Sequence, residues 1–251
     1  MLQTHPFVLT IAGFDPSAGA GMLADIKTFE QLGSYGLGAL SCLTLQTEYH
    51  FYQLDWIPEY QLLENVELLC AQYPIEALKI GVLKDISQLA SLVKIARSYR
   101  EHLFICWDPV LRSTTGQDFF AGERPTAEQL ACIDLITPNY QEIDFFRATN
   151  ESVEACCIRL SYTCAVLLKG GHNPNQPGFD SLYQRGEVRL LTPDANIAIQ
   201  DKHGSGCVLS SAICAYKSRG HTLFSACKAA KQYTVQFLAS NPTLLGYHHV
   251  Q

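Results

Sequence analysis

Apolar runs of strand-like composition alternate with segments of helical spacing along nearly the whole chain. The runs at 6–13, 37–46 and 76–83 are short and end at or near glycine or polar residues. The segments 19–32 and 58–73 place apolar side chains on one helical face. This alternation predicts an α/β fold with a mostly parallel sheet and helices on both of its faces.

The same alternation continues towards the C-terminus. HLFICWDPV (102–110), DLITPN (134–139) and CAVLLKGG (164–171) are three further apolar runs that stop at proline or glycine. Two short β runs, near Ser181–Gln184 and Val188–Thr192, predict an antiparallel ribbon at one edge of the sheet. Further helices are predicted after a cap at Asp85, and at Asn139–Arg147, Glu151–Tyr162, 204–218 and 222–239. Because no linker, repeat or low-complexity tract interrupts the pattern, we expect one domain spanning residues 1–251.

Composition excludes several classes of partner. The 251 residues are 47% hydrophobic and carry a formal net charge of −6, with no cluster of Lys and Arg that would suit a nucleic acid. No apolar run approaches the roughly 18 residues that a membrane helix needs. The N-terminus has no basic segment of the kind that opens a secretory signal. We therefore expect a cytoplasmic protein that binds neither nucleic acid nor membrane.

The ten cysteines do not form a recognisable framework. They are scattered, Cys156 and Cys157 are adjacent, and no C-x-x-C motif is present. This spacing argues against structural zinc and against a disulfide-stapled module. We expect most of them to be small buried hydrophobic residues in a reducing compartment.

Polar or glycyl residues stand at the ends of most predicted strands. They are Asp15, Gln46, Gly81, Asp108, Asn139 and Lys169. In open α/β sheets, ligands bind beyond the carboxyl ends of the strands. These six positions are therefore candidates for the functional site.

The first glycine cluster, AGFDPSAGAGMLADIKTF (12–29), lies between a predicted strand and a predicted helix. It has neither the G-x-G-x-x-G spacing of a dinucleotide fingerprint nor the Gly-Lys-Ser/Thr of a P-loop. A tight turn with a helix cap explains it as well as a ligand loop does. Asp25 lies one turn into the helix, where a carboxylate commonly does no more than interact with the positive end of the helix dipole.

Two further segments combine charged groups with strand ends. Lys169 precedes two glycines in LLKGGH, where a lysine is either solvated or available to a phosphate. Asn139 and Glu142 in TPNYQE are three residues apart, which suits an asparagine cap with a reciprocal glutamate. The functional alternative has Glu142 holding Mg²⁺, with Asp108 as a second carboxylate at the same rim.

HGSGC (203–207) precedes a small, apolar helical segment. Gly204, Ser205 and Gly206 would offer unpaired N–H groups at a helix start, where the dipole favours an anion. The thiol of Cys207 would lean towards the thiolate there and serve as a base or nucleophile. With His203 four residues upstream, the segment also permits a Cys–His hydrolase pair. A flexible turn that caps a buried helix is the simplest alternative.

The ordered set of motifs resembles the hydroxymethylpyrimidine/phosphomethylpyrimidine kinases of thiamine biosynthesis. The motifs are TIAGFDPSAGAG, ADIKTF, LTLQ, KIGVL, DPV, ITPN followed by Glu142, LLKGGH, and HGSGC followed by LSSAI. The resemblance runs from about Val8 to Leu238 and implies a ribokinase-like, doubly wound fold. It further implies ATP as the phosphoryl donor, Mg²⁺ as the cofactor and a homodimer.

Residue by residue, the resemblance divides the motifs between two ligands. It implies that Gly13, Asp25 and Gln46 bind the aminopyrimidine, since an amide and a carboxylate can pair with a ring nitrogen and its neighbouring amine. For the nucleotide phosphates it implies an anion hole of Gly204, Ser205 and Gly206, with Lys169 as the neutralising cation. Cys207 stands where ribokinase-type relatives carry an aspartate base, and Asp108 and Glu142 match acidic positions at the magnesium rim.

The implied reaction is ATP-dependent phosphorylation of 4-amino-5-hydroxymethyl-2-methylpyrimidine and then of its monophosphate. A pyridoxal or pyridoxine kinase of the same superfamily is the alternative, although LRSTTGQDFF (111–120) lacks the cysteine that some such enzymes carry after DPV. A Cys–His hydrolase is a more distant one. The chain departs from the usual pattern at Phe14, Ala18, Thr47–Glu48, Ser205 and Val208, and the ring of Phe14 bears on which acceptor fits.

Overall fold

The computed structural model of the chain describes residues 5–112, 119–120, 123–172, 178–192 and 197–248. Of LRSTTGQDFF, residues 113–118 therefore lie outside the described residues. One sheet runs through the molecule, with the strand order β3-β2-β1-β4-β5-β6-β7-β8-β9. The strands are β1 (Phe7–Phe14), β2 (Tyr35–Gln46), β3 (Phe51–Trp56), β4 (Ile75–Ile80), β5 (Phe104–Trp107), β6 (Leu135–Ile136), β7 (Ala165–Leu168), β8 (Asp180–Gln184) and β9 (Glu187–Leu191).

The centre of the sheet is parallel and its two edges are antiparallel. Strands β2, β1, β4, β5, β6 and β7 pair in parallel, while β8 and β9 form the predicted antiparallel ribbon. β3 pairs antiparallel with β2 and was not predicted. Five of its six side chains are polar or aromatic and none is buried, so it lacks the apolar run by which the other strands were found.

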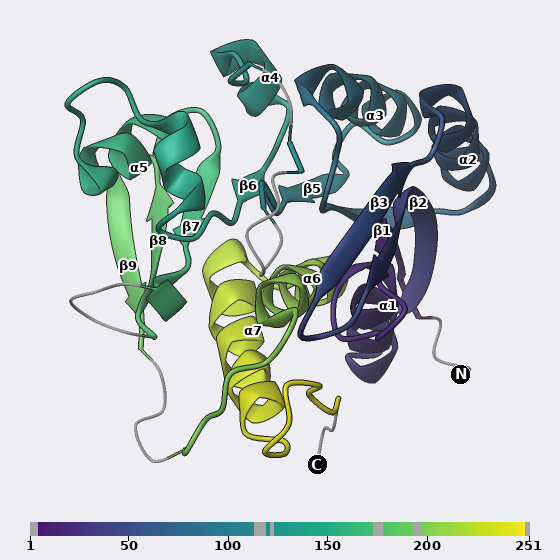
Figure 1. The fold of residues 1–251 in the computed structure, drawn as a ribbon. Helices are drawn as coiled ribbons and strands as arrows, with labels where there is room; N and C mark the ends of the chain where they lie inside the picture. The colour runs from purple at the N-terminus through teal and green to yellow at the C-terminus, as the bar shows by residue number, and fades with distance from the viewer. Residues whose placement is uncertain (1–4, 113–118, 121–122, 173–177, 193–196, 249–251) are drawn as a thin grey trace.

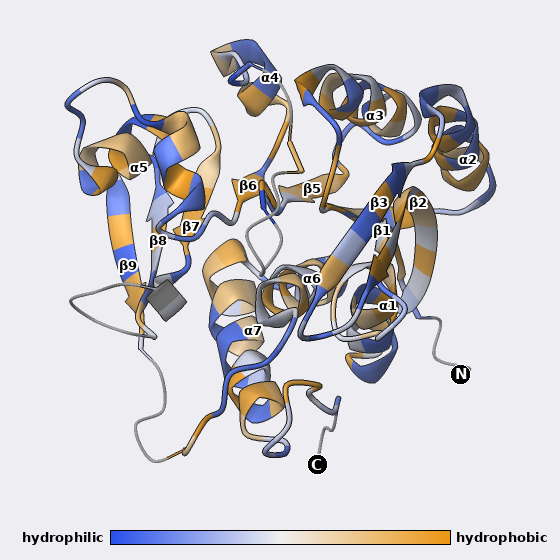
Figure 2. Ribbon diagram, in the orientation of Figure 1, coloured by the Kyte–Doolittle hydropathy of each residue, from blue (hydrophilic) through white to orange (hydrophobic). Residues whose placement is uncertain are grey.

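Helices cover both faces of the sheet, as predicted (Figure 1). On one face, α1 (Gly21–Gln31) packs against α6 (Ser205–Ser218), and α6 packs against α7 (Leu223–Leu238). On the other lie α2 (Glu59–Gln72), α3 (Ile86–Tyr99), α4 (Ala127–Ala131) and α5 (Val153–Ser161). The helices turn their apolar sides to the sheet (Figure 2), so each face has its own buried cluster. The fold is the doubly wound, mostly parallel α/β sheet that the sequence predicts.

Local capping mostly follows the sequence. Asp85 caps α3 by accepting a hydrogen bond from the backbone N–H of Gln88, as predicted. The helix predicted at Asn139–Arg147 is instead a short 3₁₀ helix, η1 (Glu142–Phe146). Asn139 forms a parallel bridge with Lys169, so the backbone is still extended there and the helical turn begins later.

The cysteines behave as expected. All ten are free, and seven of them are buried. Within the described part of the chain, no helix is long and apolar enough to cross a membrane.

Candidate active site

Two glycine loops meet at the carboxyl ends of the central strands. Gly204 has φ +76°, and a Cβ there would lie 2.1 Å from the carbonyl oxygen of Gly19. Only a glycine permits both this backbone conformation and this contact. The loop after β1 and the HGSGC segment therefore touch through their backbones, which brings the N-termini of α1 and α6 together.

A buried hydrogen bond between His203 and Asp15 joins the same two loops. Asp15 accepts hydrogen bonds from the backbone N–H groups of Ser17 and Ala20 and from the Ser17 hydroxyl. His203 donates from Nε2 to Asp15 Oδ2 across 2.9 Å. Burial alone would raise the pKa of Asp15, but the hydrogen bonds from His203 and Ser17 lower it. His203 Nε2 is thus paired with Asp15 rather than with Cys207, the partner that the hydrolase alternative requires.

Lys169 draws the two predicted metal-binding carboxylates together. Its ammonium nitrogen is 2.7 Å from Asp108 Oδ1 and 3.5 Å from Glu142 Oε2. Burial opposes the charge on Lys169, but the two carboxylates outweigh it and raise the pKa of the lysine. A Cβ on Gly206 would lie 3.2 Å from the same nitrogen, so Lys169 also borders the start of α6.

Asp108 is fixed on all sides. Thr137 donates to Oδ1 and Ser210, from α6, donates to Oδ2, and the aspartate is 1% exposed. Mg²⁺ is commonly held by one or two carboxylates together with substrate phosphates and water. Asp108 and Glu142 fit that donor set if a phosphate oxygen joins them and Lys169 turns to the phosphate.

The contacts of Glu142 also match the alternative in which it forms a helix cap with Asn139. Asn139 Oδ1 accepts from the backbone N–H groups of Gln141 and Glu142, and Glu142 Oε2 accepts from the Asn139 N–H at 2.7 Å. This is a reciprocal cap. Burial raises the pKa of Glu142, Asp108 adds to the rise, and Lys169 opposes it. The residue therefore both caps η1 and lies at the carboxylate cluster.

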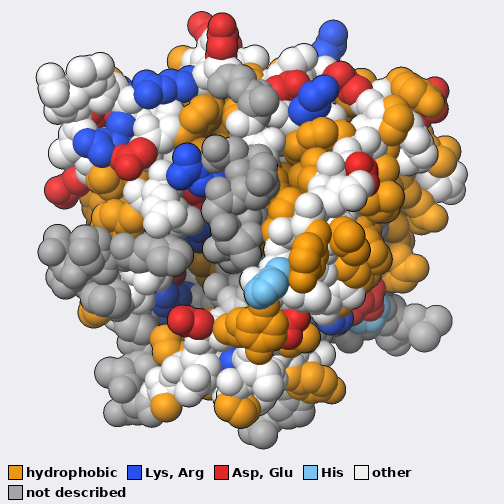
Figure 3. Space-filling model, in the orientation of Figure 1, with side chains coloured by type: hydrophobic (Ala, Val, Ile, Leu, Met, Phe, Trp, Pro, Cys, Tyr) orange, Lys and Arg blue, Asp and Glu red, His pale blue; other side chains and the backbone are white. Residues whose placement is uncertain are grey.

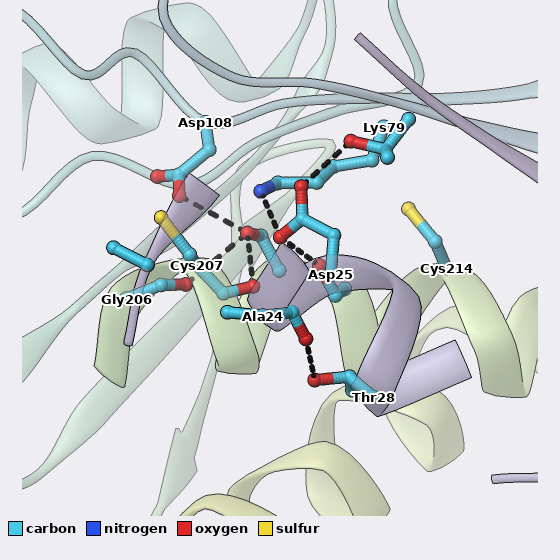
Figure 4. A network of polar contacts seen from close by, with 12 residues as sticks. Ala24, Asp25, Thr28, Lys79, Asp108, Gly206, Cys207 and Cys214 are labelled. Carbon is cyan, nitrogen blue, oxygen red and sulfur yellow. Dashed lines mark hydrogen bonds and ion pairs between the residues drawn. The ribbon is translucent and has the colours of Figure 1, made fainter. Parts of the chain in front are cut away.

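Asp25, a predicted aminopyrimidine contact, already has three partners in the protein. It is completely buried, and its two oxygens accept from Thr10, Lys79 and Ser211 over 2.6–2.7 Å (Figure 4). Asp25 is the counter-ion of Lys79 in this structure, and its contact with the aminopyrimidine stays a prediction.

The predicted ionisation of Cys207 requires a correction. It is half-buried at the first turn of α6, but burial raises the pKa of its thiol to about 11, against the lowering by Lys79 and by the Gly21 N–H. The helix terminus and the lysine do not overcome the loss of hydration. The predicted lean towards the thiolate is wrong for the chain without substrates.

The other two predicted substrate residues lie at neighbouring strand ends. Gln46 is half-buried at the end of β2, and Thr44 in the same strand donates to the Phe14 carbonyl, which ties β2 to the N-terminal loop. Gly13 is buried, and a Cβ there would lie 2.7 Å from Cys42 Sγ. Packing between β1 and β2 therefore already explains a glycine at 13.

Four residues that complete the network were missed from the sequence. They are Thr10, Lys79, Ser210 and Ser211, which hold Asp25 and Asp108. Lys79 left a signal, because it interrupts the apolar strand EALKIGVL, where an unpaired lysine would be very costly. The two serines left none, since small hydroxyl residues are ordinary in a buried helix.

Comparisons with known proteins agree with the motif order. The family model described as phosphomethylpyrimidine kinase matches residues 15–250. A hydroxymethylpyrimidine/phosphomethylpyrimidine kinase of Aquifex aeolicus is 34% identical over 245 residues, 94% of this chain and 95% of that protein. The Escherichia coli enzyme of the same description is 30% identical over 247 residues, 94% of this chain and 92% of that protein.

Solved structures of kinases share this fold. A phosphomethylpyrimidine kinase from Clostridium difficile superposes with a TM-score of 0.73 at 26% identity, covering 92% of this chain and 98% of that one. A pyridoxal kinase from Staphylococcus aureus in complex with pyridoxal superposes with a TM-score of 0.78 at 25% identity, covering 94% of this chain and 89% of that one. The fold is thus shared by kinases named for two different acceptors.

Proposed function

Because the chain belongs to the phosphomethylpyrimidine kinase family, we propose that it transfers a phosphoryl group from ATP to 4-amino-5-hydroxymethyl-2-methylpyrimidine and then to its monophosphate, in thiamine biosynthesis. The chain is a phosphotransferase with a ribokinase-like fold. The observation that carries the proposal is the meeting of Lys169, Asp108, Glu142 and Cys207 at the N-terminus of α6.

The start of α6 and Lys169 suit the transferred phosphate. Phosphoryl transfer depends mainly on positioning and on stabilising charge. Gly204, Ser205 and Gly206 open the helix and provide backbone N–H groups at its positive end. Lys169 borders Gly206 and supplies a full positive charge. Asp108 and Glu142 would hold Mg²⁺ with the phosphate oxygens, and the ion would neutralise charge on the group in transfer.

Cys207 is the base in this proposal. The acceptor hydroxyl attacks the γ-phosphorus of ATP, its proton passes to the Cys207 sulfur, and the bond to the β,γ-bridging oxygen breaks to release ADP. Only the thiolate can take that proton. With a thiol pKa of about 11 in the chain alone, the thiolate has to be stabilised by positive charge around it.

Gln46 and the N-terminal loop suit the aminopyrimidine. An amide side chain donates one hydrogen bond and accepts another, which matches a ring nitrogen beside an amine. Phe14 is half-buried and its carbonyl is held by Thr44, so its backbone is fixed at this end of β2. In this proposal Gln46 makes the main specific contact with the ring, and Asp25, which also accepts from Lys79, is the second predicted contact.

We extend the proposal to assembly and location. The 1–251 chain acts as a single kinase domain in a homodimer, and exposed Leu43, Leu45 and Tyr52 on the β2–β3 edge offer an apolar surface to a second copy (Figure 3). Its free cysteines suit the reducing cytoplasm. Light scattering after gel filtration tests the dimer, and Leu45→Glu should shift it to the monomer.

Initial rates of ADP release with three acceptors test the activity. We expect turnover with the aminopyrimidine and with its monophosphate. Turnover with pyridoxal alone would favour the alternative that the Staphylococcus aureus structure raises. Cys207→Ala should fold and bind both substrates but lose about 10²–10⁴-fold in rate, the usual contribution of a general base. Cys207→Asp should keep measurable activity, and wild-type turnover in the alanine variant would remove Cys207 from the mechanism.

A further inference from the structure

A buried ion pair lies directly beneath the first turns of α6. Lys79 on β4 and Asp25 on α1 are both 0% exposed, and the ammonium nitrogen donates to Asp25 Oδ1 across 2.6 Å. Removing two charges from water is costly even when they are paired. Packed apolar side chains would fill this space at lower cost, so the pair calls for an explanation beyond stability.

The pair is adjacent to Cys207. Ser211 donates to the same Asp25 oxygen that receives Lys79, at 2.7 Å. Ser211 follows Cys207 by four residues in α6, so the two side chains lie on one face of the helix, one turn apart. Figure 4 shows Cys207, Lys79, Asp25 and Asp108 around this turn. A Cβ on Gly81 would lie 3.7 Å from the Lys79 nitrogen, which places that ammonium at the carboxyl end of β4.

Charges from four elements act on the Cys207 sulfur. Lys79 on β4 lowers the pKa of the thiol more than any other charged group does, although burial has the larger, opposite effect. Asp25 on α1 and Asp108 after β5 raise it. Lys169 after β7 also interacts with the thiolate, but more strongly with Asp108 and Glu142. Lys79 is therefore the cation that acts most strongly on the sulfur, although its own closest partner is Asp25.

We propose that Lys79 is a positioning residue for phosphoryl transfer, which acts through Cys207 by holding a fixed, buried positive charge beside its sulfur. Asp25, Thr10 and Ser211 fix that charge in place. The inference rests on the proposed role of Cys207 as base. When the sulfur holds a negative charge before it takes the acceptor's proton, Lys79 is the cation that stabilises it.

Alkylation of Cys207 by iodoacetamide measures this effect without turnover. The thiolate sulfur displaces iodide and forms a thioether, so the rate at fixed pH follows the thiolate fraction. The labelled peptides are quantified by mass spectrometry. Exposed Cys132 is the internal control for reagent and pH, and fully buried Cys214 reports any opening of the fold.

The proposal predicts effects of opposite sign for the two members of the pair. Asp25→Asn should speed the alkylation of Cys207, because Lys79 loses its carboxylate and the thiolate becomes its nearest counter-ion. Lys79→Met should slow it by about tenfold or more, which corresponds to one pKa unit. Rates that change in the same direction in both variants, or that follow Cys214, would mean a purely structural pair and overturn the proposal.

A second comparison covers the case in which Lys79→Met alone fails to fold. The variants Asp25→Asn and Asp25→Asn/Lys79→Met both lack the buried carboxylate and differ only in the lysine charge. The double variant should label Cys207 about tenfold more slowly than the single one. Equal rates would refute the role of Lys79.

Turnover separates this inference from the proposed function. If Cys207→Ala keeps full kinase activity, Cys207 is not the base and the role of Lys79 in transfer falls with it. If Cys207→Ala is inactive but the alkylation rate is insensitive to Lys79, only the role of Lys79 falls.

Discussion

Gly204 joins the two glycine loops, and a single methyl group there should separate them. Gly204→Ala faces two penalties. An alanine at φ +76° costs about 1–2 kcal/mol. Its Cβ would also meet the Gly19 carbonyl oxygen at 2.1 Å, so the loops would have to move apart by about 1 Å, at a typical overpacking cost of about 1–3 kcal/mol. We expect a total loss of about 2–5 kcal/mol in the free energy of unfolding.

Gly220→Ala is the matched control. Gly220 ends the segment after α6 at φ +85°, and nothing lies within 4 Å of its Cβ position. The free energy of unfolding of Gly220→Ala should fall only by the conformational cost of about 1–2 kcal/mol, and its turnover should stay that of the wild type. Urea denaturation gives the two free energies, and initial rates below the unfolding transition give the two activities. In Gly204→Ala we expect turnover to fall about 10²-fold, because a displacement of about 1 Å at a catalytic site has that effect. Equal stability losses in the two variants, or wild-type turnover in folded Gly204→Ala, would refute the role of the loop contact.

Three further variants test separate parts of the site and fold. Gln46→Ala should weaken aminopyrimidine binding by roughly 1–3 kcal/mol in calorimetry while ATP binding stays constant, and an equal loss for both ligands would contradict its assignment to the ring. Glu142→Gln should keep its melting temperature, since its amide oxygen can still accept from the Asn139 N–H, but should need more Mg²⁺ for half-maximal activity; an unchanged Mg²⁺ requirement would leave only the cap. Glu151→Gln should melt below the wild type at pH 6, and this gap should close as pH falls from about 4.5 towards about 2, because the hydrogen bond from Arg159 lowers the pKa of Glu151 to about 2 and its stabilisation is lost over that window.

The meeting of residues at strand ends was predictable from the sequence. Parallel strands bring their carboxyl ends to one edge, so Asp108, Asn139 and Lys169 had to lie near one another once the alternation was recognised. The bridge between Asn139 and Lys169 and the ion pair between Lys169 and Asp108 confirm this gathering. The cap formed by Asn139 and Glu142 was equally accessible, because it depends only on a spacing of three residues.

The polar network under α6 was not predictable in the same way. Asp25 and Lys79 are 54 positions apart, and Ser211 lies 186 positions from Asp25. Their contact depends on which helix crosses which strand, and neither periodicity nor spacing encodes that. The prediction of a lowered pKa for Cys207 was wrong for a related reason. The sequence shows a thiol at a helix start but does not show how completely its sulfur is desolvated.

Helix α6 is synthesised late but covers strands that are synthesised early. It packs on β1, β4 and β5, whose last residue is Trp107, while the helix itself begins at Ser205. At about 5–20 residues per second, the ribosome leaves that apolar face of the sheet uncovered for several seconds. During this time the nascent chain exposes an apolar, aggregation-prone surface. Ser210 and Ser211 have not yet been synthesised, so Asp25 and Asp108 lack their partners from α6. The apolar face is therefore covered and the proposed phosphate site is completed in one late step of translation, when the C-terminal helices leave the exit tunnel and dock.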